Sequence, residues 1–372
     1  MRVEDFVRIL DVEFYTGVPD SQLKALCNYL DDNYGISKNH IIAANEGNAV
    51  ALAAGYHLAT DKIPVIYMQN SGIGNTVNPL VSLMNDCIYG IPSILIIGWR
   101  GEPGVKDEPQ HKFQGMITLD LLKTMDIEYF ILEKDTSVEE AEAAMDVFNK
   151  AIKLGKTVAF VVKKDSLSYE GKKIKDSQFA LTREEAIEGI LTASGNDVIV
   201  STTGKASREV FEIRERHGNN HEKDFLTVGS MGHASSIATT IAIYKKQKRV
   251  WCIDGDGAAI MHMGAMATLG SMEIDNIVHV LVNNFSHETV GGMPTVSKTI
   301  EWGTVAKAVG YDLVYKVDCL NALEDVLTAI KKEKGKIFLE VVTNQDSRKD
   351  LGRPTTSTKE NKEAFTNYLK KN

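Results

Sequence analysis

Two loops in the second half of the chain carry oxygen ligands of the kind that bind hard cations. Asp256 lies between two glycines directly after an apolar run, and Asn283 and Asn284 end the next apolar run. If both runs are adjacent parallel strands joined by a helical crossover over residues 258–274, their carboxyl ends meet at one edge of a sheet. A carboxylate, an amide carbonyl and a backbone carbonyl suit Mg²⁺ or Ca²⁺ rather than zinc.

The residues around Asp256 also suit a phosphate group. Gly255 and Gly257 permit positive φ and a close approach of the backbone. The helix expected after Gly257 would direct backbone N–H groups, including that of Ala258, at an anion. The pattern predicts a metal-assisted diphosphate site. Its plainer alternative is a tight turn in which Asp256 and the Asn pair only cap the backbone.

A basic cluster follows a different apolar run, residues 91–99. It comprises Arg100, Lys106, His111 and Lys112. In a chain with a formal net charge of -8, this cluster suits a dianionic head group. The alternative is a solvated loop, because three acidic residues lie in the same stretch. His111 and His287 are candidate proton donors, since the unperturbed pKa of histidine is near neutrality.

Apolar runs alternate with helical patterns, such as 46–60 and 137–155, along the whole chain. The expected strands are residues 40–45, 63–70, 91–99, 127–132, 157–163, 197–203, 224–230, 249–257, 277–284, 311–317 and 336–344. Such short, fully apolar runs are typical of parallel strands buried on both faces. The sequence therefore predicts an α/β protein with two doubly wound, mostly parallel-sheet domains, residues 1–165 and 183–372, joined by a polar linker at 166–182.

Composition narrows the functional classes. The negative net charge gives no general attraction to nucleic acid or to anionic membranes. No apolar run is long enough to span a bilayer, and the first ten residues carry acids that a signal peptide lacks. The four cysteines show no metal-binding spacing, so we expect buried thiols in a reducing compartment. The expectation is a cytoplasmic protein.

The GDG motif at 255–257 and the NN motif at 283–284 together resemble the signature of thiamine-diphosphate-dependent enzymes. The resemblance implies thiamine diphosphate and Mg²⁺ as cofactors. It implies that Asp256, Asn284 and the backbone carbonyl of Ser286 are the metal ligands, and that Asn283 shapes the loop. Gly255, Gly257 and Ala258 would then lie at the diphosphate.

Two further stretches match landmarks of the same family. Glu46 begins the Ala-rich helical pattern 46–60 after an apolar run, and it is similar to the family's glutamate that activates the aminopyrimidine ring. Taken alone, Glu46 would be an acid that favours a helix N-terminus. Gly229 and Met231 resemble the turn that binds the cofactor's amino group and supports its bent shape.

Four stretches resemble the two-domain decarboxylases of this family that act on phosphonopyruvate, with those that act on sulfopyruvate as the close alternative. They are residues 14–24, 70–80, 98–115 and 287–295. The third is the most diagnostic and adds Gln114 to the candidate substrate-binding residues. The first adds Asp20 and Ser21, for which capping of a helix is an equal interpretation.

The resemblance implies non-oxidative decarboxylation of 3-phosphonopyruvate to phosphonoacetaldehyde and CO₂, in phosphonate biosynthesis. It also implies a homo-oligomer, at least a dimer, with the active site at the subunit interface and no central third domain. An acetolactate-type carboligase and a non-catalytic Mg²⁺–diphosphate-binding protein are the remaining alternatives. Residues 166–182 leave no room for the third domain that such a carboligase would carry.

Overall fold

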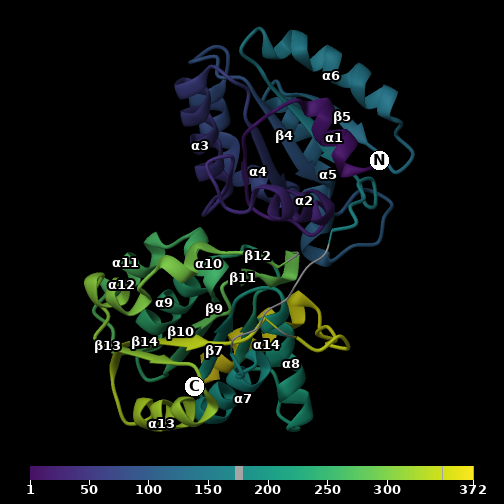
Figure 1. Ribbon diagram of the computed structural model, residues 1–372. Helices are drawn as coiled ribbons and strands as arrows, with labels where there is room; N and C mark the ends of the chain where they lie inside the picture. The colour runs from purple at the N-terminus through teal and green to yellow at the C-terminus, as the bar shows by residue number, and fades with distance from the viewer. Residues whose placement is uncertain (172–178, 291, 346, 372) are drawn as a thin grey trace. The chain divides into compact units, whose positions relative to one another are not determined.

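The structure is a computed structural model that describes residues 1–171, 179–290, 292–345 and 347–371. It divides into two compact units, each built on its own parallel sheet (Figure 1). Unit 1 comprises Met1–Ile174 and His287–Met293, and unit 2 comprises Lys175–Ser286 and Pro294–Asn372. The expected linker at 166–182 and the stretch 287–295 each include positions that lie outside the described residues.

Unit 1 is built on six parallel strands in the order β2-β1-β3-β4-β6-β5. In that order the strands are His40–Ile42, Tyr15–Gly17, Val65–Gln69, Ser93–Gly98, Thr157–Val162 and Glu128–Leu132. Every residue of β4 and β6 is buried, as expected for strands covered by helices on both faces.

Helices cover both faces of the unit 1 sheet. One face packs against α1 (Val3–Leu10), α2 (Lys24–Tyr34) and α6 (Val138–Ile152). The other packs against α3 (Glu46–Thr60), α4 (Ile73–Pro79), the π-helical turn η2 (Leu80–Met84) and α5 (Pro109–Thr124). A 3-10 turn, η1 (Asn70–Gly72), leads into α4. The side chain of Asn45 caps α3 by accepting a hydrogen bond from the Asn48 N–H at 2.9 Å, which fixes where the helix begins.

Unit 2 repeats this architecture with the strand order β13-β14-β10-β9-β7-β8. In that order the strands are Leu313–Val317, Gly335–Val342, Asn276–Asn283, Val250–Gly255, Val198–Ser201 and Asp224–Leu226. All of these pairings are parallel. Two short strands, β11 (Ser286–His287) and β12 (Met293–Pro294), pair separately after β10.

The helices of unit 2 also lie on both faces of its sheet (Figure 1). One face packs against α7 (Arg183–Ser194), α8 (Lys205–Arg216) and α13 (Leu320–Ile330). The other carries α9 (Ala234–Tyr244), α10 (Asp256–Met261), α11 (Gly264–Gly270) and α12 (Trp302–Ala308). A 3-10 turn, η3 (Glu288–Val290), follows β11, and another, η4 (Val296–Thr299), precedes α12.

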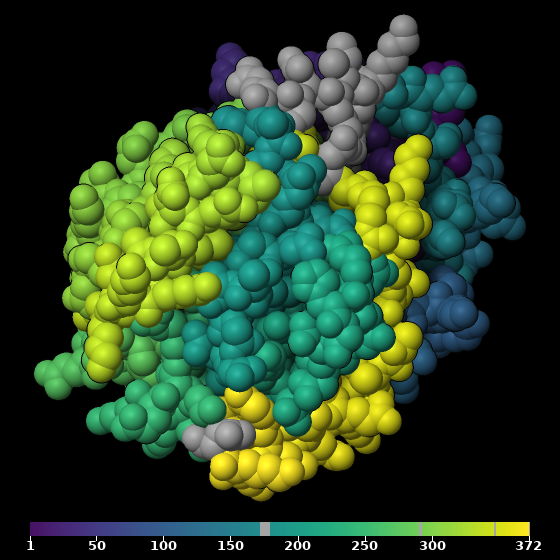
Figure 2. Space-filling view, turned by 90° about the horizontal axis from the view of Figure 1, so that it is seen from below, coloured from purple at the N-terminus to yellow at the C-terminus, as the bar shows by residue number. Residues whose placement is uncertain are grey.

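The last helix, α14 (Thr358–Lys371), packs along the edge of unit 2. Its Phe365 is buried, and Asn361 donates a hydrogen bond to the carbonyl of Asp224 at 2.8 Å. Figure 2 shows this yellow C-terminal segment lying against the teal residues of the same unit. This helix is therefore packed onto the unit through one buried face.

The predicted α/β class and all eleven predicted strands are confirmed, and the described residues contain no third domain. Two local predictions fail. Strand β1 was not predicted, because it has only three residues and one of them is Gly17. The crossover after Asp256, predicted as one helix, is broken at His262, whose φ of -132° and ψ of 49° leave the helical region.

Two expectations from composition can be compared with the structure. None of the described helices is long and apolar enough to cross a membrane. No disulfide joins the four cysteines, all of which are described, and Cys27 and Cys252 are buried. Cys87 and Cys319, however, are exposed, contrary to the expectation of buried thiols.

Candidate active site

The structure brings Asp256 and Asn284 together at the carboxyl edge of the unit 2 sheet. β9 and β10 pair in parallel with Gly255 opposite Val282, so the residues that follow each strand are neighbours. Asp256 is 3% exposed, and the backbone N–H groups of Gly257 and Asn284 direct hydrogen bonds at its carboxylate. The Thr295 hydroxyl donates a further hydrogen bond to Asp256 Oδ2 at 2.5 Å.

The backbone turns sharply between the two other predicted metal ligands. Asn284 Oδ1 accepts a hydrogen bond from the Ser286 N–H at 3.1 Å. Phe285, between them, has a φ of 58°, which is the left-handed conformation that non-glycine residues rarely adopt. By contrast, neither Gly255 nor Gly257 has a positive φ, because one ends a strand and the other lies in α10. Neither glycine therefore uses the positive φ that its missing side chain permits.

The chemistry of this pocket fits a magnesium ion. Burial raises the pKa of Asp256 from 3.8 to about 7, so the hydrogen bonds it receives do not offset the loss of water. A divalent cation would supply the positive charge that stabilises the ionised form of the buried Asp256 carboxyl group. Asp256, the Asn284 side-chain carbonyl and the Ser286 backbone carbonyl form an all-oxygen donor set of the kind Mg²⁺ takes from proteins, with phosphate and water completing the shell.

A second cluster of metal-type ligands lies inside unit 2, on β9 and β10. The ligand atoms of Cys252, Asp254 and His279 all lie within 4.8 Å of one another, and all three residues are buried. His279 Nδ1 is hydrogen-bonded to the Tyr311 hydroxyl at 2.7 Å. This mixed sulfur, nitrogen and oxygen set does not suit Mg²⁺. The magnesium prediction therefore depends on the loop-tip oxygens.

The loop that contains Gly229 and Met231 lies beside the GDG turn. It connects β8 to α9, and Gly232 within it has a φ of 85°. A Cβ at Gly232 would lie 2.8 Å from the carbonyl oxygen of Ala258, so only glycine fits there. The structure thus places the second predicted cofactor loop in contact with the start of α10.

Glu46 lies at the carboxyl edge of the unit 1 sheet, where it is the first residue of α3. It is 6% exposed and accepts a hydrogen bond from Asn75 Nδ2 at 2.7 Å. Its carboxyl group packs against Gly72, where an added Cβ would lie 2.4 Å from Glu46 Oε1. Asn75 is a partner that the sequence did not reveal, although its place after β3 could have suggested it.

Arg100 follows the end of strand β4, and its guanidinium is paired with the carboxylate of Asp107. Its Nε and Nη2 donate to the two oxygens of Asp107 at 2.8 and 2.5 Å, and its Nη1 donates to Ser21 Oγ at 2.9 Å. Asp107 also accepts from the Gly101 N–H at 2.8 Å. Burial alone would raise the pKa of Asp107, but the Arg100 guanidinium lowers this pKa well below its usual range. The positive charge of the predicted basic cluster is therefore partly neutralised by Asp107, which lies in the same stretch of the chain.

Asp20 caps the turn that leads into α2. It is fully buried, and its Oδ2 accepts from the backbone N–H groups of Gln22 and Leu23 at 3.0 and 3.3 Å. Gln69 Nε2 donates to Asp20 Oδ1 at 2.5 Å. Both oxygens are therefore engaged, which favours the capping interpretation for Asp20, whereas Ser21 directly contacts Arg100.

The remaining candidates in this region lie near or on α5. Lys106 lies in the loop before the helix, and His111, Lys112 and Gln114 lie in its first turns. The two lysines are exposed, and Gln114 is half-buried. His111 Nδ1 is buried without a hydrogen-bond partner among the described residues, and burial and the nearby Arg100 lower the pKa of His111. His287 lies in β11 and is half-buried.

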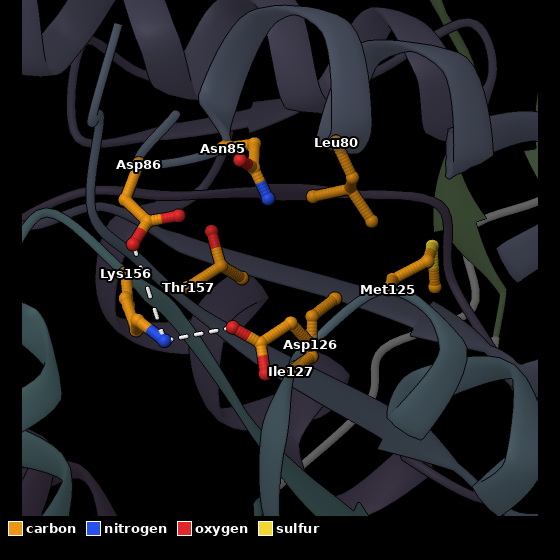
Figure 3. Close-up of a pocket in the computed structure, with 8 residues that line it drawn as sticks. All are labelled: Leu80, Asn85, Asp86, Met125, Asp126, Ile127, Lys156 and Thr157. Carbon is orange, nitrogen blue, oxygen red and sulfur yellow. Dashed lines mark hydrogen bonds and ion pairs between the residues drawn. The ribbon is translucent and has the colours of Figure 1, made fainter. Parts of the chain in front are cut away.

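Two cavities lined by described residues lie away from the candidate residues. Figure 3 shows one in unit 1, where Lys156 bridges Asp86 and Asp126 at 3.9 and 2.7 Å. Its volume of about 20 Å³ has room for roughly one water molecule. A larger hollow of about 350 Å³ in unit 2 is lined by Asn276 and Lys336, close to where β10 and β14 begin. Both lie at the amino ends of strands, whereas the candidate residues lie at the carboxyl ends.

Comparison with known families identifies the class that this fold and this site define. Residues 3–124 match the thiamine pyrophosphate enzyme, N-terminal TPP binding domain, and residues 202–341 match the corresponding C-terminal TPP binding domain. The first match includes Glu46 and Arg100, and the second includes the GDG and NN motifs. The chain is a thiamine-diphosphate enzyme.

Individual relatives narrow the class to decarboxylases. The chain is 32% identical to phosphonopyruvate decarboxylase from Streptomyces viridochromogenes over 97% of its length and 92% of that protein. It is 25% identical to sulfopyruvate decarboxylase from Methanosarcina acetivorans over 90% of its length and 87% of that protein. It is 35% identical to the alpha subunit of sulfopyruvate decarboxylase from Methanococcus maripaludis, over 44% of its length and 92% of that subunit. The chain therefore belongs to the thiamine-diphosphate-dependent decarboxylase family that includes phosphonopyruvate decarboxylase.

Proposed function

We propose that this protein decarboxylates 3-phosphonopyruvate to phosphonoacetaldehyde and CO₂, using thiamine diphosphate and Mg²⁺. The observation that carries this proposal is the similarity to a phosphonopyruvate decarboxylase along 97% of the chain, at higher identity than to the full-length sulfopyruvate decarboxylase. The product aldehyde would then serve phosphonate biosynthesis.

Residues of unit 2 would hold the cofactor. Asp256, Asn284 and the Ser286 carbonyl would bind Mg²⁺, and the first turn of α10, with the Ala258 N–H, would face the diphosphate. Gly229 and Met231 would contact the rest of the cofactor from the loop after β8. When bound, thiamine diphosphate supplies the electron sink that accepts the electron pair of the breaking C–C bond.

Glu46 would act on the aminopyrimidine ring of the cofactor. Its carboxyl group is buried and oriented by Asn75, so it can hold a hydrogen bond to a ring nitrogen without competition from water. The packing against Gly72 leaves the carboxyl group little freedom to turn away. Glu46 is therefore the side chain that we assign to cofactor activation.

The substrate's anionic head group would meet the Arg100 region of unit 1. Arg100 offers a planar guanidinium that Ser21 and Asp107 already orient, and Lys106 and Lys112 add exposed positive charge nearby. His111, whose Nδ1 has no hydrogen-bond partner among the described residues and which lies close to Arg100, is our candidate to deliver the proton that the product requires. Gln114 on the same helix would complete the contacts.

A substrate panel tests the reaction. Purified protein loaded with Mg²⁺ and thiamine diphosphate is supplied with phosphonopyruvate, sulfopyruvate or pyruvate, and CO₂, aldehyde and acetolactate are measured. We expect CO₂ and aldehyde mainly from phosphonopyruvate, and no turnover by Glu46→Ala. Absence of CO₂ from phosphonopyruvate would reject the proposal, and acetolactate from pyruvate would indicate a carboligase. Cofactor binding without turnover on any acid would indicate a non-catalytic protein.

Sulfopyruvate decarboxylase is the second candidate function. The match to the Methanosarcina enzyme also spans most of both chains, and a sulfonate presents oxygens similar to those of a phosphonate. The two substrates differ in charge, because the phosphonate can carry a second negative charge near neutrality. A higher kcat/KM for sulfopyruvate than for phosphonopyruvate in the same panel would select this function.

We also propose that the chain works as a homo-oligomer, at least a dimer, with the active site at the subunit interface. The helices next to Glu46 expose apolar side chains, namely Leu52 on α3, Val77 on α4 and Val81 on η2. These side chains would support such an interface, because another chain that covered them would remove their apolar surface from water. Sedimentation of the wild type should give a dimer or larger species. Leu52→Arg should shift it toward the monomer, and a monomeric, active wild type would reject the proposal.

A further inference from the structure

The peptide between two of the proposed metal ligands is held in an unfavourable conformation. Phe285 has a φ of 58°, and it links Asn284 to Ser286. A non-glycine residue in the left-handed region is strained, and it persists only where neighbouring groups hold its backbone in place. Both backbone groups of Phe285 are in fact engaged: its N–H donates to Asn283 Oδ1 at 3.2 Å, and its carbonyl accepts from the Thr295 N–H at 3.0 Å.

Asn283 is the centre of a buried network beneath this turn. Its Oδ1 accepts a second hydrogen bond, from Ser297 Oγ at 2.9 Å, and its Nδ2 donates to Glu340 Oε1 at 2.9 Å. Trp302 Nε1 donates to Ser297 Oγ at 2.8 Å and so directs the serine hydroxyl. An amide side chain can rotate to exchange its oxygen and nitrogen, but a carboxylate only accepts. Glu340 therefore determines which end of Asn283 faces Phe285.

Glu340 is itself an unusual residue for its position. It lies in β14, a central strand, where it is 2% exposed among apolar neighbours. A buried carboxylate is unfavourable unless it has partners that use it. Its partners are Asn283 and, at 3.3 Å, the Nζ of the exposed Lys316. The only buried partner of this carboxylate that is recorded in the described residues thus leads to the metal loop.

The same network reaches the third ligand from the other side. Thr295, which receives a hydrogen bond from the Ser297 N–H at 3.3 Å, donates from its hydroxyl to Asp256 Oδ2. The loop is closed at its base by the Thr295–Phe285 backbone bond. Asn283 and Thr295 therefore set the geometry of the ligands. They are in turn held by side chains from β14, η4 and α12.

We propose that Glu340 and Asn283 are positioning residues for the magnesium ion, which hold the Asn284–Ser286 turn in its metal-binding shape before the ion arrives. This inference rests on the proposed assignment of Asp256, Asn284 and Ser286 as ligands. Glu340 is not one of the residues assigned to the substrate or the cofactor. It acts through Asn283, whose amide keeps Phe285 in the left-handed conformation. Partners of metal ligands of this kind change metal affinity by about 10- to 100-fold when they are removed.

Metal titration of the full chain tests the proposal. Mg²⁺ is titrated calorimetrically into protein that contains excess thiamine diphosphate, for the wild type, Glu340→Leu, Glu340→Gln and Asn283→Ala. We expect the Mg²⁺ Kd of Glu340→Leu and Asn283→Ala to rise by about 10- to 100-fold. Glu340→Gln retains an acceptor for Asn283 and should stay within about threefold of the wild type. Saturating Mg²⁺ should restore kcat, because the ligands themselves are intact.

Glu209→Leu is the matched control. Glu209 is another buried carboxylate of unit 2, paired with Arg183 at 2.7 and 2.8 Å between α7 and α8. Its loss should lower thermal stability and leave the Mg²⁺ Kd unchanged. If Glu340→Leu does not fold, Ser297→Ala, which removes one hydrogen bond to Asn283, takes its place with an expected rise of about tenfold.

The outcomes separate this inference from the proposed function. If Asp256→Ala abolishes Mg²⁺ binding but the Glu340, Asn283 and Ser297 variants bind with the wild-type Kd, the positioning role is rejected and the metal site stands. If Asp256→Ala binds Mg²⁺ as the wild type does, the ligand assignment itself fails, and the inference fails with it.

Discussion

Replacing Asp256 with asparagine should stabilise the metal-free protein while removing its metal. Burial raises the pKa of Asp256 from 3.8 to about 7. A carboxyl group whose pKa is raised by folding gives no penalty below its unfolded pKa. The penalty grows as pH rises from about 4 to about 7 and is complete above that. At about 1.4 kcal/mol per pH unit, a shift of roughly three units corresponds to an upper limit of about 4 kcal/mol.

The net gain is smaller than this limit, because an amide is not a perfect replacement for the carboxylate. The amide of the Asp256→Asn variant keeps an oxygen that can accept from the Thr295 hydroxyl, which donates at 2.5 Å in the wild type. Its new N–H₂ group, however, has no acceptor prepared for it, which costs about 1–3 kcal/mol. We therefore expect Asp256→Asn to be about 1–3 kcal/mol more stable than the metal-free wild type at about pH 8. At about pH 5, where the wild-type carboxyl is mostly protonated, the advantage should vanish.

Thermal unfolding in a chelator measures this difference. A change of about 1 kcal/mol shifts the Tm of a unit of this size by about 2–4 °C, so the gain at about pH 8 is readily seen. Addition of Mg²⁺ and thiamine diphosphate should then raise the Tm of the wild type but not that of the variant. If the metal-free variant melts below the wild type at alkaline pH, Asp256 is compensated within the chain. The charge argument for a metal at this site is then wrong.

Three further changes test the residues of unit 1. Glu46→Gln should lower kcat by about 100-fold or more while Mg²⁺-dependent cofactor binding persists, and normal turnover would exclude Glu46 from the chemistry. Arg100→Ala should raise the KM for phosphonopyruvate by about 10- to 100-fold, the equivalent of one charge-assisted hydrogen bond. An unchanged KM would place the head group elsewhere. Because burial and Arg100 lower the pKa of His111, a proton supplied by its cationic form becomes limiting as pH rises through values below 6.5. His111→Gln should remove that decline in kcat, and an identical pH profile would identify another donor.

The sequence predicted the architecture well because buried parallel strands are a local signal. Apolar runs such as residues 93–98 carry it without reference to the rest of the chain. The short β1 gave no such signal, since Gly17 has no side chain to pack and lies against the Tyr67 backbone. The helix break at His262 depends on local dihedral angles that the composition of an Ala- and Met-rich segment does not reveal.

The partners of the candidate residues were harder to predict than the residues themselves. The spacing of charges in residues 100–112 indicated a basic cluster, and only the fold shows that Asp107 turns back onto Arg100. Thr295 lies well beyond the NN motif in the sequence, and its contact with Asp256 depends on how the intervening loop closes. One signal was available: a glutamate, Glu340, in an otherwise apolar strand is a buried charge that needs an explanation.

Arg100 in unit 1 and Asp256 in unit 2 lie in opposite electrostatic environments, and this contrast supports the different roles proposed for them. In unit 1 the cation Arg100 is already paired with Asp107, so an anionic substrate must compete with an internal carboxylate for it. Such competition favours a dianion over a monoanion, because the second charge strengthens the interaction that has to displace Asp107. In unit 2 the acid Asp256 is buried with hydroxyl and amide donors, no cation is recorded beside it among the described residues, and the raised pKa measures that deficit. A divalent ion would supply the positive charge that the buried Asp256 lacks, and oxygens of a diphosphate would fill the coordination positions that the chain leaves open.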